Sequence, residues 1–247
     1  MIVGEEIQSK CDAYIGLLDS FHFNPKTRHL DKYKDLDRWT EPYDNPRILF
    51  CYTHHYSLFS EKIKQDLVLN DFILYTHNSD GIIEDTIHSR TILECSKCIE
   101  WHAQNKCMDH PKLKFMPIGI ANSMWPHGAD TFRRVSPRPK SKEIYFQFSI
   151  DTNRATRIPC YMNLKDRIEW LPPVDPLEYF NRLSEYKYCI CPEGNGPDTH
   201  RLWECFYLDV IPIVKASVFT NQLLQLDIPL VVCNEWDPDE IYRLTQL

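Results

Sequence analysis

The sequence predicts an α/β protein made of two lobes, each built around a parallel sheet. Short apolar runs alternate with stretches of helical periodicity along both halves of the chain, and a Pro-rich polar stretch separates the two series. Strands separated by helices are typical of βαβ units. The stretch 136–141 (SPRPKS) is the expected linker, so we expect an N-terminal domain over 1–138 and a C-terminal domain over 139–247.

The first half begins with a predicted helix and continues with three predicted strands. The helix rests on apolar residues at helical spacing, namely Ile7, Cys11, Tyr14, Ile15 and Leu18. Residues 21–45 are polar and rich in turn-forming residues, so we expect irregular structure there. Apolar runs predict strands over 47–52, 71–76 and 114–118, and the spacing of Ile92, Cys95 and Ile99 predicts a helix over 90–104.

The second half repeats the alternation of strands and helices. Strands are expected over 143–148, 188–191, 210–214 and 229–233. The helices between them are expected over 175–184, 199–208 and 218–224, and a last helix over 237–247.

Polar motifs follow the predicted strands at their carboxyl ends. In open parallel sheets, ligands bind beyond these ends, at the point where the strand order reverses. Applied to both halves, this rule nominates Thr53 and His54, 77–80, 119–122, 149–154, 192–201 and Lys215. The gathering of polar motifs at these positions indicates a ligand site in each half.

The most informative segment is 188–204, YCICPEGNGPDTHRLWE. It combines a buried strand, a turn containing Gly194 and Gly196, and a helix for which Asp198 or Thr199 is a suitable N-cap. Such a turn directs backbone N–H groups and the positive end of the helix dipole at one point, which suits phosphate. The spacing matches neither the Walker pattern nor G-x-G-x-x-G, and an ordinary tight turn is the alternative interpretation.

Two charged residues in the first turns of this helix suit a nucleoside diphosphate. The Arg201 guanidinium would bind the phosphates and the Glu204 carboxylate the ribose hydroxyls. A surface ion pair for Arg201 and a salt bridge within the helix for Glu204 are the alternatives. Further candidates for donor contacts are Asn195, Thr199, Arg154 and Ser149. Turn formation and capping explain Asn195 and Thr199 equally well.

The stretches 191–204 (CPEGNGPDTHRLWE) and 210–214 (VIPIV) resemble the nucleotide-sugar-binding region of exostosin-like glycosyltransferases, particularly the short soluble members encoded by chlorella viruses and other large DNA viruses. Three further stretches, 72–80, 110–122 and 144–153, are similar to the same viral group, so the resemblance covers about residues 47–214. It implies a GT-B fold of two facing Rossmann-like domains, with the donor in the C-terminal domain and the acceptor in the N-terminal domain. It also implies inversion at the anomeric carbon.

Inverting transfer needs a base that deprotonates the acceptor hydroxyl. Asp80, which ends the motif THNSD, is the first candidate, and an Asx-turn or a helix cap is its alternative. His77 is the second candidate, with a structural hydrogen bond as its alternative. His54 and His55 follow the first strand and are expected to line the acceptor site. The residues expected to contact substrate are His54, Asn78, Asn122, Trp125 and His127, although a Trp that fills core space is an equally good interpretation of Trp125.

The formal net charge of −7 argues against a general nucleic-acid binder, which would carry a basic face. A phosphorylated donor therefore needs local basic residues, and the chain supplies Arg201, Arg154, Arg157, Lys140 and Lys142. No apolar run approaches the length of a membrane span, and the first residues lack the features of a signal peptide. We therefore expect no transmembrane segment and a cytoplasmic location, in the host cytosol if the protein is viral.

Cysteines and acidic pairs raise the question of a metal. Several of the ten cysteines lie in apolar strands or helices, where free Cys behaves as a small hydrophobe. A compact zinc spacing runs through Cys95, Cys98, His102, Cys107 and His110, but it falls on a predicted helix. Asp35-Leu-Asp37 and Asp237-Pro-Asp239 lie outside the strands of the nucleotide-binding half. We therefore predict no metal site and no obligatory cofactor beyond the nucleotide sugar.

The function expected from these observations and from the resemblance is an inverting glycosyltransferase. It would move a sugar, with xylose as one candidate, from a UDP-sugar to a glycan acceptor, in the synthesis of viral glycoprotein glycans. The rivals are a non-catalytic nucleotide-sugar or glycan-binding module, a nucleotide-sugar hydrolase and, more distantly, a zinc-binding interaction protein.

Overall fold

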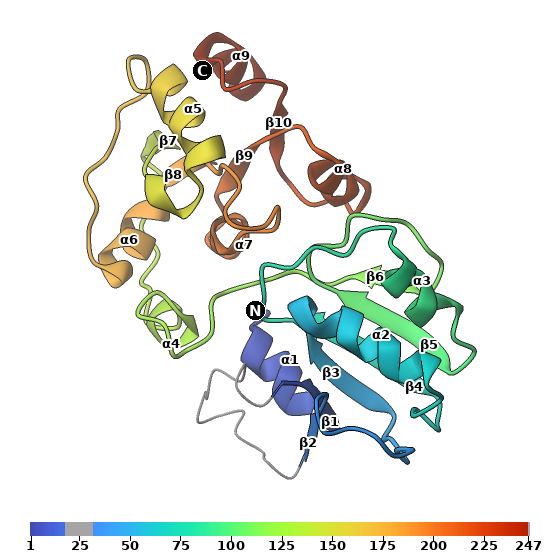
Figure 1. The fold of residues 1–247 in the computed structure, drawn as a ribbon. Coiled ribbons are helices and arrows are strands. Elements are labelled where there is room, and N and C mark those ends of the chain that lie inside the picture. Colours follow the sequence, from blue (N-terminus) through green and yellow to red (C-terminus); the bar gives the residue numbers. More distant parts are fainter. Residues whose placement is uncertain (18–31, 247) are drawn as a thin grey trace. The chain divides into compact units, whose positions relative to one another are not determined.

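We describe the fold from a computed structural model, which describes residues 1–17 and 32–246. The protein is a mixed α/β protein with two parallel sheets, one of six strands and one of four (Figure 1). It divides into two compact units, the first spanning Ile2–Ile118 and the second Gly119–Leu247 together with Met1. The predicted α/β class with two parallel sheets is confirmed.

The first unit contains the six-stranded sheet in the order β2-β1-β3-β4-β5-β6, with every neighbouring pair parallel. Its strands are β1 (Ala13–Gly16), β2 (Tyr33–Asp35), β3 (Ile48–Tyr52), β4 (Phe72–His77), β5 (Cys98–Ala103) and β6 (Leu113–Phe115). The order reverses between β1 and β3, because the chain first adds strands on one side of β1 and then continues on the other. This is the position at which open α/β sheets bind ligands.

Among the described residues, three helices accompany this sheet: α1 (Gly4–Lys10), α2 (Tyr56–Lys64) and α3 (Ile87–Glu94). Helices α2 and α3 cover one face, where Phe59 and Ile92 pack with Leu49, Leu74 and other buried residues of the strands. The opposite face carries a second cluster of Cys11, Tyr14, Phe50 and Tyr52. Alternate residues of β3 thus enter different cores, as the two-residue repeat of a strand requires. A short 3-10 turn, η3 (Thr53–His55), joins β3 to α2.

The second unit contains the four-stranded sheet in the order β10-β9-β8-β7, again parallel throughout. Its strands are β7 (Lys142–Tyr145), β8 (Tyr186–Ile190), β9 (Ile211–Lys215) and β10 (Val231–Cys233). The described strands follow one another in sequence order, so this sheet has no reversal point. Of the two features that mark a ligand site in a parallel sheet, this sheet therefore has the carboxyl edge but not the reversal point. The helices that follow β8 and β9 begin at that edge.

The helices of the second unit lie on both faces of its sheet. They are α4 (Ala129–Phe132), α5 (Arg154–Leu164), α6 (Pro176–Leu183), α7 (His200–Tyr207), α8 (Val218–Gln225) and α9 (Pro238–Thr245). Cys160 and Leu164 of α5 and Ile241 of α9 pack with Ile190 and Ile213 on one face. Helices α6 and α7 lie on the other face, where their side chains contact those of Tyr145 and Cys189.

Tyr33–Asp35 forms strand β2 inside the stretch expected to be irregular, and helices α2 and α5 were not predicted. Two of the predicted helices also differ. The opening helix ends at Lys10, and Ala13–Gly16 is instead strand β1, fully buried and paired on both sides; Leu18 lies outside the described residues. The helix predicted over 90–104 ends at Glu94, and Cys98–Ala103 forms strand β5 between β4 and β6. In both places the segment is a strand and not a helix. A neighbouring strand on each side completes the hydrogen bonds of its backbone.

The division between the units falls between Ile118 and Gly119, earlier than the predicted boundary at residue 138. The reason is packing: α4 lies against α6, with the ring of Phe132 edge-on to that of Phe180 at 4.9 Å. In addition, His200 Nδ1 bonds to the backbone oxygen of Gly119 at 2.7 Å. The segment before the linker therefore belongs to the second unit.

All ten cysteines are free thiols, and Cys51, Cys189, Cys191, Cys205 and Cys233 are buried as the sequence predicts. In the part of the chain that the structure describes, no helix is both long enough and apolar enough to cross a membrane.

Candidate functional site

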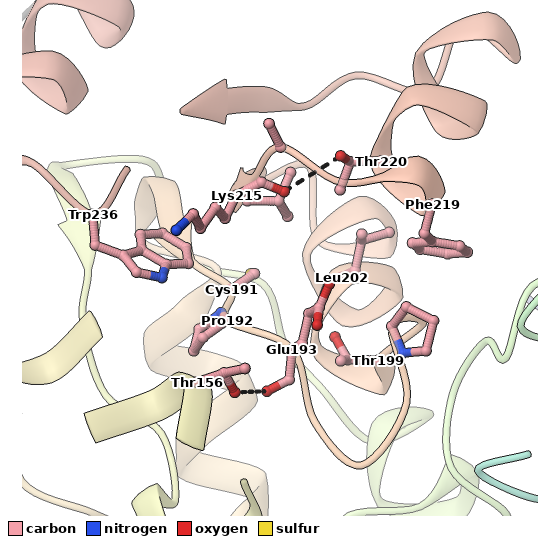
Figure 2. A pocket seen from close by; sticks show the side chains of 13 residues that line it. Thr156, Cys191, Pro192, Glu193, Thr199, Leu202, Lys215, Phe219, Thr220 and Trp236 are labelled. Carbon is pink, nitrogen blue, oxygen red and sulfur yellow. Dashed lines mark hydrogen bonds between the residues drawn. The ribbon is translucent and has the colours of Figure 1, made fainter. Parts of the chain in front are cut away.

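A cavity of about 220 Å³ opens at the carboxyl edge of the four-stranded sheet, and we call it the α7 pocket (Figure 2). The segments that follow β8, β9 and β10 form it together with the first turns of α5, α7 and α8. Its lining residues are Thr156, Cys191, Pro192, Glu193, Pro197, Thr199, Leu202, Val214, Lys215, Ala216, Phe219, Thr220 and Trp236. Part of the predicted 192–201 motif and Lys215 therefore border one cavity.

The front of α7 is the polar end of this pocket. Thr199 is the N-cap residue, in an extended conformation, and its hydroxyl makes no capping bond to the helix backbone. The first N–H groups of a helix need partners, and the helix dipole makes this end positive. Figure 2 places Thr199 beside Glu193 and Leu202, with Lys215 and Trp236 together at another side of the cavity. This arrangement can accept an anion at the helix front.

The turn that carries the two predicted glycines rests on α5 rather than lining the cavity. Asn153 donates its side-chain amide to the Gly194 oxygen at 2.7 Å, and the Gly194 N–H donates to the Gly196 oxygen. Gly194 and Gly196 are buried, whereas Asn195 is exposed. The start of α5 thus holds the turn in place through Asn153, the N-cap residue of that helix. The sequence patterns did not predict this helix.

Arg157, and not Arg154, is the arginine beneath this turn. Its Nε donates to the Glu193 oxygen at 2.9 Å and its guanidinium also donates to the Ser149 oxygen at 2.7 Å. Burial, and then the positive charge of Arg201, lower the pKa of Arg157 to about 10. Arg154 instead lies on the surface and pairs with Asp151 at 2.5 Å. Ser149 was predicted to contact the nucleotide-sugar donor. In the structure its backbone oxygen accepts a hydrogen bond from the Arg157 guanidinium.

Arg201 and Glu204 lie on a different side of α7 and do not line the pocket. The Arg201 guanidinium lies 5.1 Å from the centre of the Tyr179 ring and donates to Cys189 Sγ at 3.9 Å. Tyr179 Oη donates to Glu204 Oε2 at 2.6 Å, and Glu204 is only 4% exposed. Burial raises the pKa of Glu204, although the positive charge of Arg201 and the Tyr179 bond oppose this shift. These side chains join α6, α7 and β8 in the interior.

The segment that precedes α4 brings His127 close to this interior cluster. A positive charge on His127 would lower the pKa of Glu204. The Trp125 ring stacks beside His127, with ring centres 6.2 Å apart, and is about half exposed. The Asn122 oxygen accepts the Trp125 N–H at 3.0 Å, and a side chain on Gly128 would collide with that oxygen. Trp125, His127 and Asn122 therefore form one tight turn with an exposed aromatic face.

In the first unit, His77 lies inside the protein. It is 1% exposed, its Nε2 is 2.9 Å from the Pro117 oxygen and its Nδ1 is 3.0 Å from Asn78 Oδ1. Since both ring nitrogens are already engaged with protein atoms, His77 fits the structural alternative rather than the role of base. Asn78 has a left-handed backbone (φ 60°) and also donates to Gln8 Oε1 at 3.3 Å.

Asp80 and His54 are both exposed at the carboxyl edge of β3 and β4. His54 Nδ1 is 2.9 Å from Ser79 Oγ, which already accepts the backbone N–H groups of His54 and Gly81 at 3.2 Å each. The Ser79 hydroxyl thus holds both the backbone and the ring of His54 at this edge of the sheet.

His55 adjoins this pair but is only 4% exposed, with its ring centre 3.9 Å from that of His54. Its Nδ1 has no hydrogen-bond partner among the described residues. Burial, and then the charge of His54, lower the pKa of His55 to about 4. His55 is therefore neutral near pH 7.

The metal candidates of the sequence do not assemble. Within the described ranges, the group of three possible ligands whose atoms lie close together is Cys189, Cys191 and Cys205, not the set from Cys95 to His110. Asp237 caps α9 by accepting the Asp239 N–H, and Asp35, which ends β2, accepts the Asp37 N–H. The two acidic pairs thus have structural roles.

Five pocket residues escaped the sequence analysis: Thr156, Ala216, Phe219, Thr220 and Trp236. Trp236 follows the carboxyl end of β10, so the strand-end rule applied to the last strand would have found it. Thr156 and Phe219 lie in the first turns of α5 and α8, at the same edge.

Comparison with known protein families finds no family model that matches this chain. No curated protein matches it either. The resemblance to exostosin-like glycosyltransferases therefore stays a prediction.

Proposed function

We propose that this protein is an inverting glycosyltransferase of GT-B architecture that takes a sugar from a nucleotide-sugar donor, a UDP-sugar being the first choice. The observation that carries the proposal is the α7 pocket: a cavity at the carboxyl edge of a parallel sheet, at the uncapped front of a helix. Parallel α/β sheets bind phosphorylated ligands at such edges, because helix N-termini offer N–H donors there.

The diphosphate of the donor would meet the front of α7, beside Thr199. Backbone N–H groups and the helix dipole favour an anion there. Lys215 lines the pocket and pairs with Glu235 at 2.6 Å, and Arg157 lies beneath the adjoining turn, outside the lining. Arg201 would support the site from within, by holding α7 against β8 and Tyr179.

The nucleoside would occupy the pocket itself. Its volume of about 220 Å³ is below the roughly 300–1,000 Å³ of pockets that hold a whole ligand, so the sugar would lie outside. Trp236 and Phe219 offer apolar walls for the base. Glu193 is half-buried, burial raises its pKa, and it lines the cavity, whereas Glu204 does not. We therefore assign the ribose hydroxyls to Glu193 in place of Glu204.

The acceptor would bind at the carboxyl edge of the first sheet. Asp80 is the exposed carboxylate there and would take the proton of the acceptor hydroxyl. His54, whose ring Ser79 holds at this edge, would contact the acceptor. Trp125 offers an exposed aromatic face for a sugar ring in the second unit.

Nucleotide binding and substitution at the pocket test this proposal. Calorimetric titration with UDP, CDP, GDP and ADP should give saturable binding with UDP preferred, and UDP-sugars should release UDP when a glycan acceptor is present. Ala216 is exposed and lines the pocket, so Ala216→Phe should fill the cavity and lower affinity at least 10-fold. Ala155→Phe, at an exposed helical position outside the lining, is the matched control and should bind as wild type.

The outcomes separate the rival functions. Binding without UDP release in any condition would favour a non-catalytic module, and release that is independent of acceptor would favour a hydrolase. Equal nucleotide affinity in Ala216→Phe and wild type would remove the α7 pocket from the proposal.

A further inference from the structure

Three thiols converge beneath α7, and we call them the thiol triad: Cys189, Cys191 and Cys205. Cys189 and Cys191 are two residues apart at the end of β8 and so point to the same face of the sheet. Cys205 faces them from α7, with its Sγ 3.8 Å from that of Cys191. All three sulfur atoms lie within 4.8 Å of one another, and all three residues are buried free thiols.

We propose that the thiol triad is a binding site for a single Cu(I) ion. Three sulfur atoms placed about 2.3 Å from one metal in a plane lie about 4 Å apart, close to the separations found here. Structural zinc requires four ligands, and no fourth His, Cys, Asp or Glu of the described residues joins the group. Soft thiolate ligands select Cu(I), which accepts three-coordinate geometry.

The surroundings of the triad favour an anionic sulfur complex. Cu(I) would displace the protons of the thiols that bind it, and the resulting complex of three thiolates and Cu⁺ carries a charge of −2. The nearby Arg201 guanidinium, which donates to Cys189 Sγ, offsets part of that charge.

The triad borders the α7 pocket through Cys191, which is part of the pocket lining (Figure 2). A metal site needs ligands at suitable distances, partners for the ligands and an entry route. The thiol triad supplies the ligands and the Arg201 partner within a single unit of the protein, and an ion would enter from the α7 pocket beside Cys191.

Titration of the fully reduced protein with Cu(I) under anaerobic conditions tests this proposal. A chromophoric Cu(I) chelator serves as competitor. We expect one tightly held Cu(I) per chain, thiolate-to-metal charge-transfer absorption in the ultraviolet, and an X-ray absorption spectrum with three sulfur neighbours. Binding should release thiol protons and raise the unfolding temperature.

Variants locate the ion. Cys205→Ser and Cys205→Ala should each weaken Cu(I) binding at least 100-fold, and circular dichroism should show that the metal-free variants remain folded. Cys160→Ser is the matched control, because Cys160 is buried in the same unit but packs on the opposite face of the sheet. If wild type and both Cys205 variants bind Cu(I) alike, or if wild type binds none, the proposal is overturned. Preferential binding of Zn²⁺ with four ligands would overturn the choice of metal.

Discussion

Among single residues, His55 couples the stability of the first unit to pH. Its pKa in the folded protein is about 4, against 6.5 for an unperturbed histidine. Between pH 6.5 and 4, His55 is protonated in the unfolded chain but stays neutral in the folded protein. The free energy of unfolding therefore falls as the pH drops through this range. One pKa unit corresponds to about 1.4 kcal/mol, and we expect a loss of about 3 kcal/mol through this group.

Urea unfolding at several pH values measures this loss. His55→Gln cannot take up the proton, so its stability should fall less than that of wild type between pH 6.5 and 4. Parallel pH profiles for the two proteins would show that the ring is protonated in the folded state.

The hydrogen bond from Tyr179 to Glu204 gives a second prediction for single residues. Tyr179→Phe removes the donor that satisfies Glu204 Oε2 at 2.6 Å and leaves a buried carboxyl group short of a partner. A buried polar group that loses its bond costs about 1–3 kcal/mol, and we expect that loss in the free energy of unfolding. Tyr161→Phe is the control, because the Tyr161 ring packs against Trp170 and Phe146. A Tyr179→Phe protein as stable as this control would contradict the structural role of Glu204.

At the scale of elements, α1 docks on the end of β4 through a glycine. A methyl group on Gly4 would lie 1.7 Å from Asn78 Oδ1 and 2.6 Å from His77 Nδ1. Alanine normally stabilises a helix by about 1 kcal/mol over glycine. Here we expect Gly4→Ala to lower the free energy of unfolding by about 2 kcal/mol or more, because hydrogen bonds fix both neighbours in place.

The double variant Gly4→Ala/Asn78→Gly tests the cause of that loss. Asn78→Gly removes the colliding oxygen and also suits the left-handed backbone at this position. Chemical denaturation should show recovery of much of the stability. Gly4→Ala alone at or above wild-type stability would show that α1 does not pack as described.

The elements that sequence patterns missed share a physical cause. Ala13–Gly16 is buried on both faces, so its residues show no polar alternation, and Tyr14 and Ile15 fit a helical repeat equally well. In α3 and β5, Ile92, Cys95 and Ile99 keep helical spacing although the helix ends at Glu94. Only the neighbouring strands decide between the two structures. Pro159 lies inside α5, and a proline usually argues against a helix.

The sequence predicted which edge of the sheet carries the candidate site, but not which side chains face the cavity. Apolar runs placed β8 and β9 well enough to locate part of the 192–201 stretch and Lys215 beside one cavity. Which side of α7 faces that cavity depends on α6 and α8, far away in the sequence. Thr199 and Leu202 face the pocket, whereas Arg201 and Glu204 face Tyr179.

Over the whole molecule, the two units differ in the order of their strands. The first sheet reverses between β1 and β3, as doubly wound sheets do, whereas the second follows the sequence order from β7 to β10. Each unit has a hydrophobic core of its own. Independent cores allow a chain to be divided into parts that fold alone, provided that the cut falls between the units.

The position of the cut gives a prediction for two fragments. Fragment 119–247 retains α4, whose Phe132 packs on Phe180 and Tyr207 and whose Ala129 is fully buried. Fragment 139–247, cut at the boundary that the sequence suggests, lacks these contacts and leaves Phe180 uncovered. Loss of one buried aromatic contact surface costs about 2 kcal/mol or more, so the longer fragment should unfold cooperatively in urea at a clearly higher midpoint. Phe132→Ala in the longer fragment should lower its midpoint toward that of the shorter one. If the two fragments unfold at the same midpoint, residues 119–138 add nothing to the second unit, and its boundary lies at the Pro-rich linker instead.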